Sequence, residues 1–245
     1  MPEICDKKLS VIIPVYNYRE RIVANLETLV MFLRDQKFDF ELIVVDDGSV
    51  DGTAKQIAAA GFGQEVILLE LPKNMGKGAA VKAGVEKACG EKIIFIDADL
   101  PYRLEAIVRI YESIGGGSDL AIGDRTLPQS KVGLKSNIIR SVMSKLFVFF
   151  VRRFALRDAH DTQCGLKGFS GMTAKKIFNL VSIYGFGFDA EALAIAEENN
   201  LKIERIPVEF TGRDGTTVKI WRDGFRMIKD LLTIRKLKRA GVYKF

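Results

Sequence analysis

The stretch KIIFIDAD, residues 92–99, joins a short apolar run to two carboxylates, Asp97 and Asp99. The four consecutive apolar residues between Lys92 and Asp97 are typical of a strand that is buried on both faces of a sheet. In an extended chain alternate residues point the same way, so the two carboxylates can share one ligand. Two carboxylates and the phosphate oxygens of a substrate are sufficient to bind Mg²⁺ or Mn²⁺. A lone DxD pattern occurs in many unrelated chains, so its interpretation depends on the neighbouring motifs.

Apolar runs and helical spacing alternate on both sides of this strand. Besides residues 92–97, we expect strands at 9–15, 41–46, 66–71 and 120–123. Helical spacing of apolar residues predicts helices at 22–32, 53–60, 79–88 and 104–114. Strands that alternate with helices form a mostly parallel sheet with helices on both faces. No linker or internal repeat divides the chain, so we expect a single α/β domain over residues 1–245.

Polar side chains follow the ends of four of these strands. They are Asp46 and Asp47, Asn74 with Lys77, Asp97 and Asp99, and Asp124 with Arg125. Ligands of open parallel sheets bind outside the carboxyl ends of the strands. A binding site explains four such clusters at one edge better than chance does.

The stretch Gly76-Lys77-Gly78 matches neither of the common phosphate-binding loops. A P-loop needs GxxxxGK followed by Ser or Thr, but Gly78 follows Lys77 here and Leu71 lies five positions before Gly76. A dinucleotide fingerprint needs Gly or Ala where this chain has Val81. The simplest interpretation is a helix that begins at a glycine. Backbone amides at such a helix start, together with Lys77, can still hold an anion.

The formal net charge is +6, and much of the excess lies at residues 131–157 and 219–244. Basic patches suit phosphates, anionic lipids and nucleic acids equally well, and a solvated surface is the simplest alternative. Aromatic residues interleaved with the basic ones would favour nucleic acid. Here the aromatic residues of the second half form an apolar block instead, so we expect no nucleic-acid partner.

Cysteine and histidine are scarce. Three widely spaced cysteines, Cys5, Cys89 and Cys164, argue against a disulfide framework and favour a reducing, cytosolic setting. A single histidine and the absence of CxxC argue against a zinc site. The first residues show no signal-segment pattern, and no apolar run approaches the roughly 18 residues of a spanning helix.

Several motifs come in the order and spacing seen in family 2 glycosyltransferases of the GT-A fold, which the chain resembles over nearly its whole length. In the first half they are PVYN at 14–17, VDDGS at 45–49, NMGKG at 74–78 and DAD at 97–99. DTQCGLKGF at 161–169, FDAE at 188–191 and IPV at 206–208 resemble the dolichyl-phosphate glucosyl- and mannosyltransferases. The resemblance implies a Rossmann-like sheet flanked by helices, with basic amphipathic helices in the second half.

The resemblance also implies roles for individual residues. Asp47 would bind the nucleoside with Tyr16 packed beside it, and Asp97 and Asp99 would hold Mg²⁺ or Mn²⁺ on the donor diphosphate. Two basic residues would contact or close over that diphosphate, Arg125 and Arg213. Two others are candidates for holding an acceptor phosphate, Arg140 and Lys167. The expected catalytic residues are Asp99, Arg125, Arg213 and Asp189. The expected substrate-binding residues are Pro14, Tyr16, Asp46, Asp47, Lys77, Asp97, Arg140, Gln163 and Lys167.

The implied reaction is inverting transfer of a hexose from UDP-glucose or GDP-mannose to a polyprenyl (dolichyl) phosphate. Residues 1–125 would bind the nucleotide sugar, and residues 126–245 would face the acceptor and the membrane. The family usually has Glu directly after Tyr-Asn, whereas this chain has Tyr18 there, which leaves both nucleotides open. The basic loop has Thr217-Val218-Lys219 where Ser-Lys is usual.

Two apolar segments suggest contact with a membrane. Residues 138–154 are apolar between basic residues, and Phe147–Val151 is apolar on all sides, which suits either a core helix or a helix in a membrane interface. Near the C-terminus an apolar and a basic stripe alternate at helical spacing, formed by Trp221, Phe225, Ile228 and Leu232, and by Arg222, Arg226 and Lys229. We therefore expect peripheral attachment at the cytoplasmic face of a membrane.

Two other reactions remain open. A saccharide hydroxyl as acceptor would need a general base, for which Asp189 is the candidate. The alternative is that Asp189 only caps a helix, which typically contributes about 1 kcal/mol. A sugar-nucleotide pyrophosphorylase would carry its Gly-rich loop after the first strand, where this chain has Tyr16-Asn17-Tyr18.

Overall fold

The computed structural model describes residues 7–132, 150–151, 153–156, 161–211 and 220–245. In this part of the chain a seven-stranded sheet has the order β3-β2-β1-β4-β7-β5-β8. Strand β7 runs antiparallel to both of its neighbours, and the other pairs are parallel. The strands span Leu9–Val15 (β1), Phe40–Asp46 (β2), Val66–Glu70 (β3), Lys92–Ile96 (β4), Leu120–Asp124 (β5), Leu166–Ser170 (β7) and Ile203–Pro207 (β8). A separate parallel pair joins Lys131–Val132 (β6) to Glu209–Phe210 (β9).

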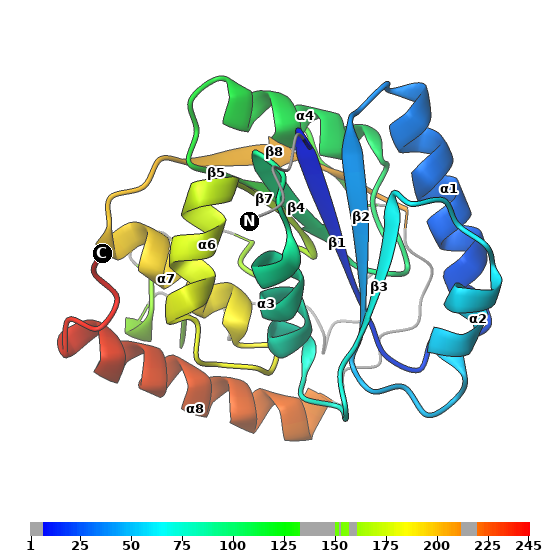
Figure 1. Ribbon diagram of the computed structural model, residues 1–245. Coiled ribbons are helices and arrows are strands. Elements are labelled where there is room, and N and C mark those ends of the chain that lie inside the picture. Colours follow the sequence, from blue (N-terminus) through cyan, green and yellow to red (C-terminus); the bar gives the residue numbers. More distant parts are fainter. Residues whose placement is uncertain (1–6, 133–149, 152, 157–160, 212–219) are drawn as a thin grey trace, which may run out of the picture.

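Helices cover both faces of the sheet (Figure 1). One apolar core lies between the sheet and α1 (Ile22–Asp35), α2 (Thr53–Ala59) and α4 (Glu105–Gly115). The other lies under α3 (Lys77–Lys87), α6 (Gly171–Leu180), α7 (Phe188–Glu198) and α8 (Ile220–Arg239). In Figure 1, α8 runs along the lower side of the molecule, where the parallel strands have their carboxyl ends.

The mostly parallel α/β fold predicted from the sequence is confirmed. Each of the five predicted strands occurs with its ends within one residue, and each predicted helix within three. Continuous burial explains the continuous apolar pattern, because every residue of β1 and β2 is buried. The insertion of antiparallel β7 between β4 and β5 was not predicted, since its sequence LKGFS carries a lysine at the centre of the sheet.

Part of the predicted membrane-contacting block packs inside the protein instead. Val151 has no exposed surface and belongs to the core under α3, α6 and α7, so the prediction that it contacts lipid is wrong. The partly buried Phe150 packs against the same core, with its ring 6.0 Å from that of Phe154. Residues 147–149 lie outside the described residues.

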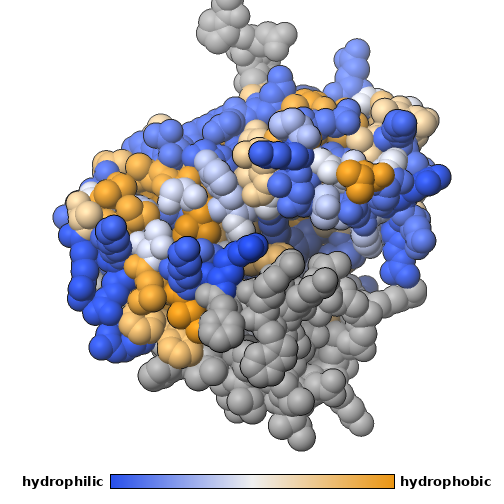
Figure 2. All heavy atoms as spheres, turned by 90° about the horizontal axis from the view of Figure 1, so that it is seen from below, coloured by the Kyte–Doolittle hydropathy of each residue, from blue (hydrophilic) through white to orange (hydrophobic). Residues whose placement is uncertain are grey.

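Helix α8 has two apolar stripes with different surroundings. Met227, Leu231 and Ile234 are buried against the body of the protein. Leu232 belongs to the other stripe, the one predicted to contact a membrane, and it is 48% exposed. Figure 2, which views this side of the molecule, shows hydrophobic and hydrophilic surface interspersed on its left half. Among the described residues, no helix is long and apolar enough to cross a membrane.

The cysteines differ in state. Cys89 forms a disulfide, although the number and spacing of the cysteines argued against a disulfide framework. Cys164 is a free, buried thiol, and burial raises its pKa to about 11. An odd number of cysteines is compatible with one bridge and one free thiol, and residue spacing alone does not reveal which side chains meet.

Candidate active site

The predicted polar clusters lie around the point where the strand order reverses. Strand β1 is flanked by β2 on one side and by β4 on the other, and all three run parallel. The segments that follow β1, β2, β3 and β4 therefore leave the sheet at the same edge, where α3 begins. Such a switch point is the usual ligand site of an open α/β sheet.

Asp47 ties the end of β2 to the start of α3. Its buried carboxylate accepts hydrogen bonds from the amides of Met75 and Gly76, at 2.7 and 2.8 Å. Burial and the neighbouring charge of Asp46 raise the pKa of Asp47, although the two amides act against this shift. The amides predicted to hold a ligand anion are thus engaged by a side chain of the protein.

Asp46 carries a buried acceptor without a donor. Its Oδ1 accepts the amide of Ser49 at 2.7 Å. Its Oδ2 has no hydrogen-bond partner among the described residues, although the side chain is buried. Buried polar atoms are nearly always hydrogen-bonded, so such an exception at a ligand edge points to a missing donor.

The DxD carboxylates stand in a turn rather than in an extended chain. Strand β4 ends at Ile96, and the amide of Leu100 donates to the carbonyl of Asp97 at 3.0 Å. The extended-chain argument for a shared ligand was therefore wrong, although the two carboxylates remain close enough to interact. Partial burial and the charge of Asp97 raise the pKa of Asp99.

Lys77, the first residue of α3, forms an ion pair with the first of these carboxylates. Its Nζ lies 2.6 Å from Asp97 Oδ1. The other oxygen of Asp97 lies against Gly165, where a Cβ atom would overlap it. Burial lowers the pKa of Lys77, but the negative charges of Asp97, Asp189 and Asp99 outweigh burial and raise it.

A second ion pair lies deeper in the protein. Lys167 of β7 has no exposed surface, and its Nζ donates to Asp189 Oδ1 at 2.5 Å and to the Cys164 carbonyl at 2.6 Å. The ammonium therefore has no access to an acceptor phosphate, contrary to the expectation for Lys167. Asp189 does not cap α7 either, because the N-cap is Gly187 and no side chain caps the helix.

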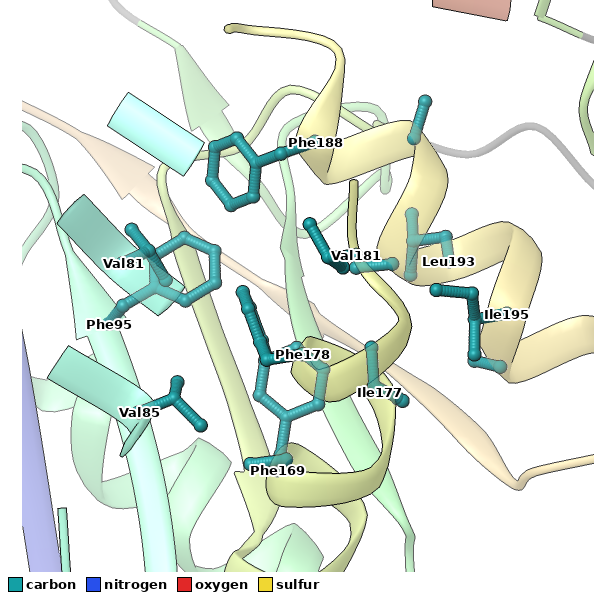
Figure 3. Packing of buried hydrophobic residues seen from close by; sticks show 14 of the residues in the cluster. Val81, Val85, Phe95, Phe169, Ile177, Phe178, Val181, Phe188, Leu193 and Ile195 are labelled. Atoms are coloured by element: carbon teal, nitrogen blue, oxygen red, sulfur yellow. The ribbon is translucent and has the colours of Figure 1, made fainter. Parts of the chain in front are cut away.

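The lysines of the two ion pairs lie close to packed aromatic rings. Phe95 and Phe188 have their ring centres 5.8 Å apart and lie next to each other in Figure 3. The Nζ of Lys77 lies 5.8 Å from the Phe188 ring, and that of Lys167 lies 5.4 Å from the Phe95 ring. Both distances are within the range of cation–π attraction.

Arg125 is held in place by a residue that the predicted site did not contain. Asp161 accepts hydrogen bonds from Arg125 Nε at 2.6 Å, from Nη2 at 2.7 Å and from its backbone amide at 3.0 Å. The DTQ motif contains Asp161, but Gln163 was selected from it, and Gln163 is exposed. A buried carboxylate opposite an arginine is visible only in the folded chain.

The remaining predicted site residues fall in different surroundings. Tyr16 is 46% exposed at the edge, as a nucleoside-packing residue requires, whereas Pro14 is buried within β1. Arg140 and Arg213 lie outside the described residues.

The donor set suits a hard divalent cation that also binds substrate oxygens. In the described chain no group of three or more His, Cys, Asp or Glu side chains could hold a metal ion. Asp97 and Asp99 are nevertheless adjacent carboxylates, and Asp97 already attracts a cation in Lys77. Mg²⁺ is commonly bound by one or two carboxylates together with phosphates of the substrate.

The buried pair makes a prediction about stability. Asp189→Asn leaves Lys167 without a charged partner, and breaking a buried ion pair in this way costs about 3–5 kcal/mol. We expect a clear fall in the urea midpoint and in Tm, measured by circular dichroism. The double variant Lys167→Met with Asp189→Leu removes both charges and should lose much less. A double variant as unstable as Asp189→Asn would show that the charge pairing is not the cause.

Comparison with known proteins gives the chain a family. Residues 10–178 match glycosyl transferase family 2. The dolichyl-phosphate beta-glucosyltransferase of Dictyostelium discoideum is 33% identical over 249 residues, which cover 96% of this chain and 76% of that protein. The human dolichyl-phosphate beta-glucosyltransferase is 30% identical over 261 residues, covering 100% of this chain and 81% of that protein.

Solved structures share the fold. Glucosyl-3-phosphoglycerate synthase from Mycobacterium tuberculosis, in complex with phosphoglyceric acid, superposes with a TM-score of 0.69 at 20% identity over 94% of this chain and 81% of that one. The same enzyme with Mn²⁺, UDP-glucose and phosphoglyceric acid gives 0.68 at 19% identity, over 94% and 80%. At these identities the likeness concerns the fold, which is the GT-A fold expected from the motifs. On the sequence matches, the chain belongs to glycosyl transferase family 2 and is related to the dolichyl-phosphate beta-glucosyltransferases.

Proposed function

We propose that this protein transfers a hexose, with inversion, from a nucleotide sugar to a polyprenyl phosphate at the cytoplasmic face of a membrane. The product would be a β-linked lipid phosphosugar. The names of the relatives favour UDP-glucose over GDP-mannose as the donor. The observation that carries the proposal is the buried Lys167–Asp189 pair, because it engages the carboxylate that a hydroxyl acceptor would need as a base.

Residues 1–125 bind the donor in this proposal. The unpaired Asp46 Oδ2 is an acceptor that an N–H group of the base or a hydroxyl of the ribose would satisfy. The exposed ring of Tyr16 offers a surface on which the nucleoside packs. Asp47 holds the β2 and α3 ends together, so it shapes the nucleoside site whether or not it contacts the ligand.

The leaving group is a nucleoside diphosphate, and charge develops on it as the glycosidic bond breaks. Asp97 and Asp99 would hold Mg²⁺ or Mn²⁺, which when bound neutralises charge on that diphosphate. Arg125 adds a guanidinium whose direction is set by its two bonds to Asp161. A donor group held in advance stabilises developing charge without reorganisation during the reaction. Arg213 remains a proposed contact of the diphosphate.

The acceptor proposed here is supported by the surroundings of Asp189. A phosphate monoester has a second pKa of about 6, so it reaches a site at neutral pH already ionised. A hydroxyl must lose its proton as it attacks, and a general base typically contributes about 10²–10⁴-fold to that step. Asp189 is 4% exposed and bonded to Lys167, which favours an acceptor that needs no base.

Aromatic side chains beside the site suit the apolar chain of such an acceptor. The Tyr184 carbonyl accepts the amide of Gly78 at 2.8 Å, so the segment carrying Tyr184 and Phe186 borders the start of α3. Both side chains are exposed, at 42% and 38%. Buried Glu191 holds this segment by accepting the amides of Ser182 and Ile183. Helix α8, which carries the exposed Leu232, lies on the same side of the molecule (Figure 1).

A direct assay tests the proposal. Purified protein with Mg²⁺ or Mn²⁺ is incubated with UDP-glucose or GDP-mannose, with and without polyprenyl phosphate, and products are identified by mass spectrometry. We expect release of UDP together with a lipid-linked glucose. Transfer only to a saccharide or to phosphoglyceric acid, which the mycobacterial enzyme binds, would contradict the lipid acceptor. Synthesis of UDP-glucose from glucose 1-phosphate and UTP would reveal a pyrophosphorylase.

The metal role gives a second prediction. Asp99→Asn should lower kcat by at least about 100-fold while Tm stays near the parent value, because removing one group that stabilises transition-state charge typically costs about 10²–10³-fold. EDTA should abolish turnover of the parent protein. The control Asp35→Asn removes an exposed carboxylate at the end of α1 and should leave turnover unchanged. Full turnover of the parent in EDTA would rule out the metal.

The exposed side chains of Tyr184 and Phe186 give a third prediction. Tyr184→Ser with Phe186→Ser should raise the KM for polyprenyl phosphate several-fold and leave the KM for the nucleotide sugar unchanged. Met172→Ser is the matched control, since Met172 is 72% exposed on α6, at the opposite edge of the sheet. Equal KM values for the lipid in the double variant and the parent would place the lipid elsewhere.

A further inference from the structure

Lys77 is a cation already resident at the carboxylates proposed to hold a divalent ion. Its Nζ lies 2.6 Å from Asp97 Oδ1, and its side chain is 19% exposed. The Phe188 ring supports the ammonium from the protein side. In the described chain this cluster contains three carboxylates, Asp97, Asp99 and Asp189, and two lysines, Lys77 and Lys167.

A divalent ion competes with this ammonium for the same oxygen. The second oxygen of Asp97 is not an alternative, because it lies against Gly165. Two cations on one carboxylate oxygen lie only a few ångströms apart, a separation at which like charges repel each other strongly near a protein surface. The repulsion from a doubly charged ion is larger. Binding of metal to Asp97 therefore requires Lys77 to move away or to find a new anion.

We propose that the ammonium of Lys77 takes the place of the divalent ion in the donor-free protein. When the donor binds, the side chain of Lys77 moves and its ammonium pairs with the donor's diphosphate instead of with Asp97. The donor would then release Asp97 for the metal, so metal and donor bind cooperatively. This inference rests on the proposed function, because it takes a nucleoside diphosphate as the anion that receives Lys77. It gives Lys77 a role in coupling the binding of metal and donor, in addition to the predicted role in substrate binding.

The coupling follows from the geometry at the start of α3. Lys77 is the first helical residue, and its backbone is fixed by the bonds of Met75 and Gly76 to Asp47 and of Gly78 to Tyr184. The backbone of Lys77 is therefore anchored, and only its flexible side chain can move. Because coupling between sites is reciprocal, the metal must strengthen donor binding by the same factor as the donor strengthens metal binding.

The test measures Mn²⁺ binding by electron paramagnetic resonance, with and without UDP, in the parent and in Lys77→Gln. In the parent, UDP should strengthen Mn²⁺ binding strongly. In Lys77→Gln without UDP, we expect Mn²⁺ to bind at least fivefold more tightly than in the parent, the low end of the roughly 5–150-fold typical of coupled sites. The ratio of affinities with and without UDP should fall in the variant.

Two further variants separate competition at Asp97 from general charge effects. Lys73→Gln removes a positive charge from an exposed position in the same segment and should bind Mn²⁺ like the parent. Lys77→Arg keeps the charge and should retain weak Mn²⁺ binding in the absence of UDP. Melting curves establish that each variant is folded.

The outcomes distinguish this inference from the proposed function. Equal or weaker Mn²⁺ binding by Lys77→Gln without UDP, while the parent binds UDP, overturns the role of Lys77 alone. The same gain in Lys73→Gln as in Lys77→Gln also overturns it. Failure of the parent to bind either UDP or GDP at any Mn²⁺ concentration overturns the nucleotide-sugar proposal itself.

Discussion

Alternating charges hold the carboxyl edge of this sheet together, from Lys167 in the interior through Asp189 and Lys77 to Asp97. Each member comes from a different element: β7, α7, α3 and the turn after β4. Desolvating an unpaired charge costs several kcal/mol, so these elements are stable only in positions where the charges meet. The register of antiparallel β7 between β4 and β5 is what brings Lys167 under the site.

The same arrangement makes the edge suitable for anionic substrates. The innermost charges neutralise each other, and the exposed end of the series carries the DxD carboxylates, which in the proposed function would hold a cation and through it a diphosphate. Arg125, directed by Asp161, adds a positive group directly after the end of β5. A carboxylate that is free to accept a proton is what a hydroxyl acceptor would need, and the pairing of Asp189 with Lys167 works against that use.

The first half of the fold was predictable, because buried parallel strands leave continuous apolar runs and their ends carry the polar motifs. The second half was not, since β7 looks like a polar segment until Lys167 is seen to have a partner 22 residues away. The same limit applies to Asp161, which contacts Arg125 across 36 residues. Residue types and motif order predicted the ligand edge, but the pairing of charges there depends on tertiary contacts that no local pattern encodes.

In the proposed reaction the acceptor arrives already ionised, so that no protein base limits the rate. The dependence of kcat/KM for the lipid on pH tests this most directly, measured with polyprenyl phosphate and with its phosphonate analogue, which has a higher second pKa. We expect kcat/KM to rise up to about pH 6 for the phosphate and then to stay level. With the phosphonate, the rising limb of the profile should move to higher pH. A rising limb at the same pH with both acceptors would belong to a group of the protein and would show that a protein base limits the reaction.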